Sequence, residues 1–259
     1  FVLKHFSLSV VFLMLVLSAC QGEKNKGTTS SSNELTAQSV IDDAIEYSGT
    51  EAYHSSEISF DFRDYHFISE ATCDGYKFSR QKGDTLEVLH NSDFNKSVAN
   101  HKIEVADSMA FKFSESINSV FYFMQLPMRL NDDAVIKELK NPQTIGDKTY
   151  HVVEARFKEE NGGEDHSDVY MYWFNQDNYA LAYFAYEYDT NGGGVRFRVA
   201  KNPQMMSGVR FVDYGNYKPK TKEVDIENLL TLFSENKLIK VSEITNTNIK
   251  VSPIKLDCH

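Results

Sequence analysis

The chain has 259 residues, of which 41% are hydrophobic, and a formal net charge of −10 at pH 7. Its length is sufficient to bury one sizeable hydrophobic core. An acidic chain that has no cluster of lysine and arginine repels phosphate backbones, so nucleic acid is not an expected partner.

The first residues predict export from the cytoplasm. The opening stretch, FVLKHFSLSVVFLMLVL, places Lys4 and His5 before an apolar run that ends at Leu17. This run is shorter than the ~20 residues that cross a bilayer. A basic start, a short apolar run and a small-residue exit are typical of a secretory signal peptide, which we predict over residues 1–19. Because the sequence begins with Phe1 rather than methionine, we expect its start to be trimmed or misassigned.

The end of this signal peptide carries a more specific pattern. Residues 17–20 read Leu-Ser-Ala-Cys, which resembles the bacterial lipobox, whose cysteine is acylated and becomes the first residue of the mature protein. We therefore predict lipidation at Cys20, and the alternative is an ordinary signal peptide that happens to precede a cysteine. The acyl chains would hold the protein at a membrane.

Residues 20–33 predict a flexible tether. The stretch after the cysteine, QGEKNKGTTSSSN, has no large apolar side chain and cannot contribute to a core. Gln21 stands where an aspartate retains lipoproteins of enteric bacteria at the inner membrane, so its presence favours the outer membrane of a Gram-negative envelope, on the periplasmic or the outer side. We expect residues 34–259 to form a single domain.

The start of that domain predicts one helix followed by short strands. Apolar residues at helical spacing from Leu35 to Ile45 predict a helix, and Gly49 is placed to end it. In SEISFDFRDYHF, Ile58 and Phe60 alternate with polar neighbours, as in a strand that has one buried face. DGYKFSRQKGD and TLEVLHNSDFNKSV continue as short strands separated by Gly and Asp/Asn turns.

The middle of the chain interrupts this strand pattern. In SESINSVFYFMQLPMRL, Ser114 is a candidate N-cap, Glu115–Gln125 a helical run and Pro127 its end. The run is apolar around much of its circumference, so we expect this helix to be buried.

The second half predicts further strands. KTYHVVEARF, DVYMYWFNQDNYALAYFAYEYD, GGVRFRVAKN and SGVRFVDYGNYKP are separated by the turn sequences NQD, TNGGG and NPQMM. The alternation of Val195, Phe197 and Val199 after the three glycines indicates a strand and excludes a phosphate-binding loop that opens a helix. A short helix near 226–233 and a return to strand alternation complete the chain.

The strands between residues 168 and 188 are apolar on both faces, with Met171 and Trp173 on one side and Tyr170 and Tyr172 on the other. Such a sheet either packs on both faces or curls around an apolar cavity. No βαβ rhythm occurs, which argues against a Rossmann fold or a TIM barrel. We predict a mainly β (α+β) fold, in which a large curved antiparallel sheet forms an open half-barrel and two or three helices plug or cover its concave face.

This order of lipobox, tether, helix, antiparallel strands and buried middle helix resembles the LolA/LppX group of lipoprotein and lipid carriers. The resemblance implies an open half-barrel whose concave apolar face receives acyl chains. More locally, DVYMYWFNQDNYALAYFAYEYDTNGGGVRFR followed by NPQMMSGVRFVDYGNYKP, within residues 168–219, is similar to domain-of-unknown-function family 6503 of bacterial lipoproteins. That family supplies neither an activity nor catalytic residues.

No catalytic or cofactor-binding motif stands out, so we expect neither catalytic residues nor a cofactor. Three Ser-x-x-Lys strings lack the partner motifs of penicillin-interacting enzymes. Asp64 and His66 are expected on one strand face, where they could serve acid/base chemistry. The loop GGEDHSD, which contains Glu164, offers Asp165, His166 and Asp168 as weak metal candidates, although a solvated charged loop is the favoured interpretation.

The sequence therefore favours a non-enzymatic lipoprotein that binds a hydrophobic ligand such as an acyl chain, a lipid or a lipoprotein. Its cavity candidates are Ile117, Val120, Phe121, Met124, Trp173 and Phe184. The alternatives are an envelope hydrolase that uses His66 or the Glu164–Asp168 loop, and a module without a cavity that docks an envelope protein partner. Cys73 and Cys258 either form a disulfide or remain buried thiols.

Overall fold

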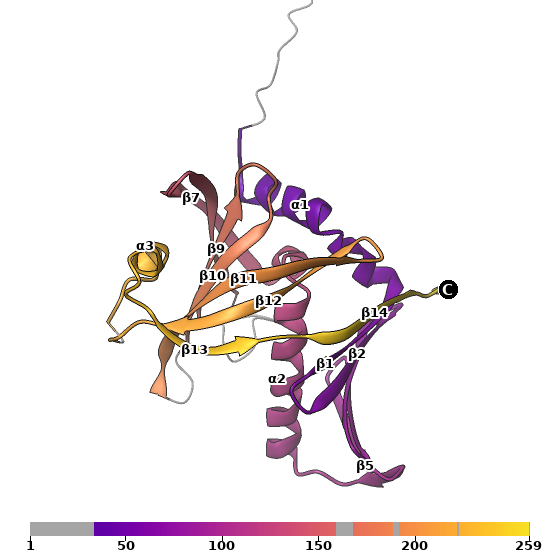
Figure 1. Ribbon diagram of the computed structural model, residues 1–259. Coiled ribbons are helices and arrows are strands. Elements are labelled where there is room, and N and C mark those ends of the chain that lie inside the picture. Colours follow the sequence, from indigo (N-terminus) through magenta and orange to yellow (C-terminus); the bar gives the residue numbers. More distant parts are fainter. Residues whose placement is uncertain (1–33, 159–167, 189–191, 222, 259) are drawn as a thin grey trace, which may run out of the picture. The chain divides into compact units, whose positions relative to one another are not determined.

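The structure is a computed structural model that describes residues 34–158, 168–188, 192–221 and 223–258 (Figure 1). The predicted signal peptide, Cys20 and the whole predicted tether lie outside the described residues. The mainly β, open antiparallel fold is confirmed, and its strands form two seven-stranded sheets. Among the described residues, no helix combines the length and the apolar character needed to cross a bilayer.

The first sheet is a meander of hairpins with one strand added from the C-terminus. Its order is β14 (Thr247–Pro253), β1 (Ser56–Phe62), β2 (Tyr65–Thr72), β3 (Gly75–Lys82), β4 (Thr85–His90), β5 (Asp93–Val98) and β6 (His101–Ile103). The predicted alternation is confirmed in β1, where Ile58 and Phe60 are fully buried.

The second sheet contains the remaining strands, which also pair antiparallel. Its order is β13 (Ile239–Ile244), β12 (Val209–Lys218), β11 (Gly194–Met206), β10 (Leu181–Tyr188), β9 (Val169–Asn175), β8 (Lys148–Phe157) and β7 (Val135–Ile145). The strand predicted after the glycines is confirmed as β11, while the predicted NPQMM turn is wrong. Strand β11 continues through that segment across a bulge, and the chain turns at Ser207 and Gly208.

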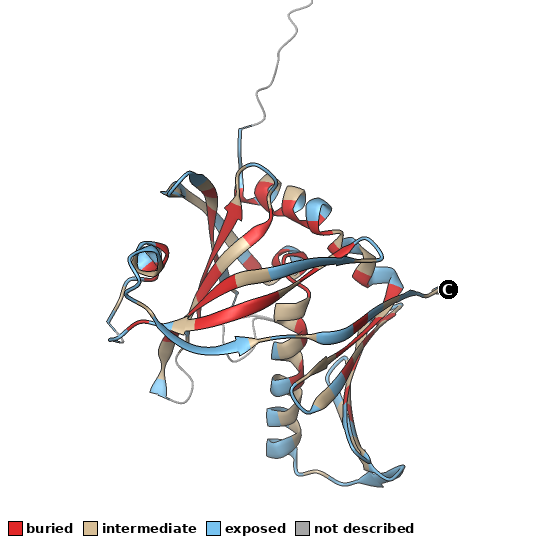
Figure 2. Ribbon diagram, viewed as in Figure 1, coloured by how far each residue is buried: buried red, intermediate tan, exposed pale blue. Residues whose placement is uncertain are grey.

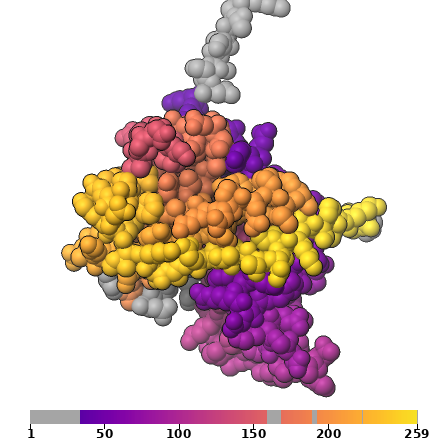
Figure 3. Space-filling view, viewed as in Figure 1, coloured from indigo at the N-terminus to yellow at the C-terminus, as the bar shows by residue number. Residues whose placement is uncertain are grey.

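One helical segment separates the strands of the two sheets along the chain, and a short C-terminal connection joins the sheets. Helix α2 (Asp107–Met124) and the 3-10 helix η2 (Met128–Asn131) separate β6 from β7 in the chain. Only residues 245 and 246 separate β13 from β14, so the C-terminal segment passes directly from the second sheet to the first. Figure 3 shows this yellow segment crossing one face of the molecule.

Helix α1 (Ala37–Ser48) matches its sequence prediction. Thr36 and Ser39 form a capping box at its start, and Val40, Ile41 and Ala44 are fully buried against the second sheet. Gly49 ends the helix with a φ of 62°, in the left-handed region that glycine favours. A Cβ there would lie 2.0 Å from the Gly208 carbonyl oxygen, so this position also requires glycine for close approach.

Helix α2 is longer than predicted, because it begins at Asp107 instead of Glu115. Ser114 is therefore not an N-cap. It lies inside the helix and donates a hydrogen bond from its hydroxyl to the Ala110 carbonyl. In the N-terminal part of the helix, Phe111 and Phe113 alternate with polar residues as they would in a strand. On the helical backbone Phe111 is exposed and Phe113 is half-buried.

The second sheet has buried residues on both faces, above all in β9, whereas its edge strand β13 is exposed along most of its length (Figure 2). One face packs on α1 and contributes Tyr172 and Phe184 to the core. The opposite face contributes Trp173 and Phe197 and packs on η4 (Ile226–Asn228) and α3 (Leu229–Ser234), which form the helix predicted near residues 226–233.

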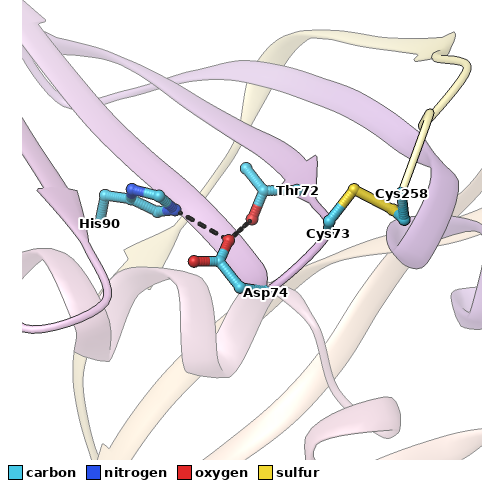
Figure 4. Close-up of a disulfide and its surroundings, with 5 residues drawn as sticks. All are labelled: Thr72, Cys73, Asp74, His90 and Cys258. Carbon is cyan, nitrogen blue, oxygen red and sulfur yellow. Dashed lines mark hydrogen bonds and ion pairs between the residues drawn. A yellow bond between two sulfur atoms is a disulfide. The ribbon is translucent and has the colours of Figure 1, made fainter.

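Cys73 and Cys258, whose pairing the sequence left open, form a disulfide (Figure 4). It joins the turn between β2 and β3 to the C-terminal segment, 185 residues away. Asp74 next to it accepts hydrogen bonds from Asn91 and Thr72, and together with His90 these lower the pKa of its carboxyl to about 2. The ionised carboxylate holds the turn that carries Cys73.

Candidate functional site

A groove with a volume of about 830 Å³ lies between α2 and the face of the second sheet that carries Phe184. This volume is within the range of about 300–1,000 Å³ that is usual for ligand pockets. Helix α2 contributes Phe111 and Phe123, and β1 contributes Phe60 and Phe62. Strands β8 to β13 all contribute further side chains, so the groove is lined from elements far apart in the chain. These include Phe157, Tyr170, Leu181, Phe184, Tyr186, Tyr188, Val212, Tyr214 and Ile244.

The centre of this groove is aromatic. The Phe123 ring on α2 lies with its centroid 5.4 Å from that of Phe184 and 5.5 Å from that of Tyr186, both on β10. Beside it, the hydroxyls of Tyr122 and Tyr172 are 3.1 Å apart. Burial raises the pKa of Tyr122 to about 12 and that of Tyr214 to about 12, so both side chains are neutral at physiological pH.

Three of the six cavity candidates line this groove, namely Val120, Met124 and Phe184. Ile117 and Phe121 do not, because they are fully buried on the side of α2 that packs on the first sheet. The Phe121 ring stacks on Phe78 with a centroid distance of 4.2 Å. The helix thus has a structural side and a groove side, which its nearly all-apolar sequence does not distinguish.

Trp173 does not line the groove either. Its neighbour in the strand, Tyr172, lies on the α1 face, and strand alternation turns Trp173 to the opposite one. There it packs on Phe197 and donates its indole N–H to Gln143 Oε1 at 3.0 Å. The prediction that placed Trp173 and Phe184 in one lining is therefore wrong.

Two basic side chains of the groove lining were missed by sequence reasoning. Arg196 and Arg198 both lie on β11 and both line the groove. The Arg196 Cζ lies 5.2 Å from the centroid of the Tyr188 ring, and the Arg198 Cζ lies 5.8 Å from that of Tyr186. The alternation in VRFRV, which places both arginines on the face opposite Val195, Phe197 and Val199, is the signal that could have found them.

The acid/base pair expected from sequence does not form. Asp64 lies in the turn after β1 and accepts a hydrogen bond from Lys82 at 2.8 Å. His66 instead contacts Asp61, with 2.6 Å between Nδ1 and Oδ1, and Asp61 accepts a second bond from Asn248. The side chains of His66 and Asp61 are 44% and 36% exposed, and neither lines the groove.

The predicted metal loop is only partly within the described residues. Asp165, His166 and Glu164 lie outside them, whereas Asp168 precedes β9, is buried and lines the groove. No cluster of three or more His, Cys, Asp or Glu side chains that could hold a metal ion occurs in the described part of the chain.

The solved structures that the chain resembles share little sequence identity with it. Among solved structures, a DUF1329 family protein from Desulfovibrio piger is 10% identical, with 83% of this chain and 92% of that chain covered and a TM-score of 0.45. A LolA superfamily protein from Nitrosomonas europaea is 14% identical, with 85% and 96% covered and a TM-score of 0.41.

No curated protein matches the sequence. The model of a family of unknown function, DUF6503, matches residues 29–246, which confirms the resemblance first seen in residues 168–219. The chain belongs to the DUF6503 family.

Proposed function

We propose that this protein is a non-enzymatic, membrane-anchored lipoprotein of the bacterial envelope that binds a hydrophobic ligand in the groove between α2 and the second sheet. The observation that carries the proposal is the groove itself, about 830 Å³ in volume and lined at its centre by Phe123, Phe184 and Tyr186. Apolar and aromatic linings in pockets of this size are typical of sites for small-molecule ligands.

The distribution of polar groups supports binding over hydrolysis. The exposed His66–Asp61 pair lies away from the groove, and its third partner is Asn248. A hydrolase of the usual kind requires a nucleophile, a base and an oxyanion site that converge on one point. Tyr122, which lines the groove, is neutral because burial raises its pKa to about 12, and its hydroxyl lies 3.1 Å from that of Tyr172; both features suit it to packing against a ligand.

We expect the protein to bind N-phenyl-1-naphthylamine, a neutral dye that fluoresces in apolar sites, and to release it when 1-dodecanol is added. Ser119→Trp on α2 should weaken dye binding by at least about tenfold, because Ser119 is exposed, lines the groove and would place an indole inside it. Fluorescence titration measures both affinities.

Met109→Trp is the matched control, because Met109 lies on the same helix, is 41% exposed and does not line the groove. This variant should bind the dye as the wild type does. Absence of dye binding in the wild type, or equal loss in both variants, would contradict the proposal.

We also expect the full chain, expressed in a Gram-negative host, to fractionate with membranes and to carry acyl chains on Cys20. Cys20→Ala should abolish the acyl mass increment and release the protein from the membrane fraction, because the lipid anchor would then be absent. Mass spectrometry of the intact protein and fractionation measure the two effects. An unmodified cysteine in the wild type would contradict the anchor and leave the groove proposal unaffected.

A further inference from the structure

We propose that the groove selects amphiphiles whose head is an oxyanion, a carboxylate or a phosphate on a hydrophobic chain, and that Arg198 together with Tyr186 binds that head. This inference rests on the proposed function, and it names the class of ligand that the groove takes.

The groove wall changes from apolar to polar along one row of cross-strand neighbours. Phe184 on β10 pairs with Arg198 on β11, Arg198 with Asn216 on β12, and Asn216 with Ser242 on β13. All four residues line the groove. A ligand lying along this row would contact an aromatic ring at one end and hydrogen-bonding groups at the other, which is the polarity of an amphiphile.

Arg198 is the unusual member of this row. It is only 8% exposed, and its Nη2 donates to the Tyr186 hydroxyl at 2.9 Å. Its Nε and Nη1 have no hydrogen-bond partner among the described residues, and none of the ion pairs formed by those residues includes it. A buried guanidinium without a counter-ion is costly to maintain, and an anionic ligand would compensate its charge.

Tyr186 provides the contact between this charge and the groove. Because its oxygen accepts the hydrogen bond from Arg198, its own O–H remains able to donate to a further acceptor. Asn216, the next residue of the row, donates its Nδ2 to the Ser242 hydroxyl at 3.1 Å, and its Oδ1 is an acceptor that has no partner among the described residues. An oxyanion beside Tyr186 would receive a hydrogen bond from the hydroxyl and the field of the guanidinium behind it.

The groove lining as a whole has a positive formal charge, as Arg198 does. Its basic side chains are Arg63, Lys112, Arg129, Arg196, Arg198 and Arg210, and its acidic ones are Glu115, Asp132 and Asp168. The acid Asp132 already pairs with Arg129 at 2.7 Å. The lining has six basic and three acidic side chains, whereas the whole chain has a formal net charge of −10. This local excess of positive charge favours an anionic ligand in the groove.

Displacement of the neutral dye by three matched amphiphiles tests the proposal. The wild type should bind dodecanoate and dodecyl phosphate at least about tenfold more tightly than 1-dodecanol. In Arg198→Met this ratio should fall to about one. Acetate and inorganic phosphate at the same concentrations should not displace the dye, because they lack the chain that the aromatic wall binds.

The thermal stability of Arg198→Met without ligand provides a second measurement, which does not depend on the dye. Because methionine removes an unpartnered buried charge and retains an unbranched apolar chain, Arg198→Met should have a Tm about 2–4 °C higher than the wild type. Arg156→Met, which removes an exposed arginine outside the groove, should change neither the ratio nor the affinity for the dye.

The outcomes separate the two proposals. If 1-dodecanol binds as tightly as dodecanoate, or if Arg198→Met retains the preference, the inference about the head is overturned and the hydrophobic site remains. A lower Tm in Arg198→Met would mean that the charge of the guanidinium is compensated in the free protein. Displacement of the dye by acetate or inorganic phosphate would mean that the groove binds small anions without a chain. Either result would overturn the inference. If neither the dye nor any amphiphile binds, the proposed function itself fails.

Discussion

Replacing Glu87 by glutamine is expected to lower the free energy of unfolding by about 3–5 kcal/mol, because it leaves two cations without a counter-ion. Glu87 lies on β4 and is 4% exposed. Its carboxylate accepts hydrogen bonds from Arg80 Nε at 2.5 Å and from Lys96 Nζ at 2.9 Å. Arg80 is also buried, and its guanidinium lies 5.1 Å from the centroid of the Tyr65 ring. Urea denaturation followed by circular dichroism measures the loss.

Two matched variants distinguish the buried pair from a general effect of charge. Arg80→Met combined with Glu87→Leu should recover most of the loss, because no buried charge then remains unpaired. Asp64→Asn breaks the exposed pair with Lys82 and should have a much smaller effect that decreases with salt. A change below about 1 kcal/mol in Glu87→Gln would contradict the interpretation that this pair is buried and coupled.

Removal of the disulfide should produce the second large effect, a loss of up to about 4–5 kcal/mol in the free energy of unfolding. Cys73 and Cys258 are separated by 185 residues, so their bond closes a very long loop in the unfolded chain. In the chain-entropy model the stabilisation grows with the logarithm of loop length. The urea midpoint of the wild type should therefore fall when a reductant is added.

The control for this prediction is the double variant Cys73→Ser with Cys258→Ser. It should unfold at the same urea concentration as the reduced wild type, and the reductant should have no effect on it. If the reductant does not shift the wild-type midpoint, the bond contributes nothing to stability. The C-terminal strand β14 would then be held by its pairing with β1 alone.

The groove illustrates how a candidate ligand site can be built without a dedicated motif. Helix α2 packs Ile117 and Phe121 on the first sheet and presents Ser119 and Phe123 to the space in front of the second sheet. The same helix therefore fixes the two sheets and forms one wall of the site. A substitution on its buried side is expected to affect folding first, whereas one on its groove side changes the volume that a ligand can occupy.

Local features of the chain were predictable because their causes lie within a few residues. The helical spacing of α1, its end at Gly49, the alternation in β1 and the strand after the glycines all follow from short-range sterics and periodicity. The helix α2 was predicted in its C-terminal part, where apolar residues crowd, and was missed before Ser114, where Phe111 and Phe113 alternate as they would in a strand.

The sequence by itself thus determined the fold class, the positions of most strands and the family to which the chain belongs. The tertiary structure alone decided that there are two sheets, that Cys73 bonds Cys258, and that Phe184 and Arg198 share a groove while Trp173 faces away. Each of these depends on pairing between residues far apart in the chain. Alternation specifies that two faces exist, but only packing against α1, α2 and α3 decides which of them is core and which is site.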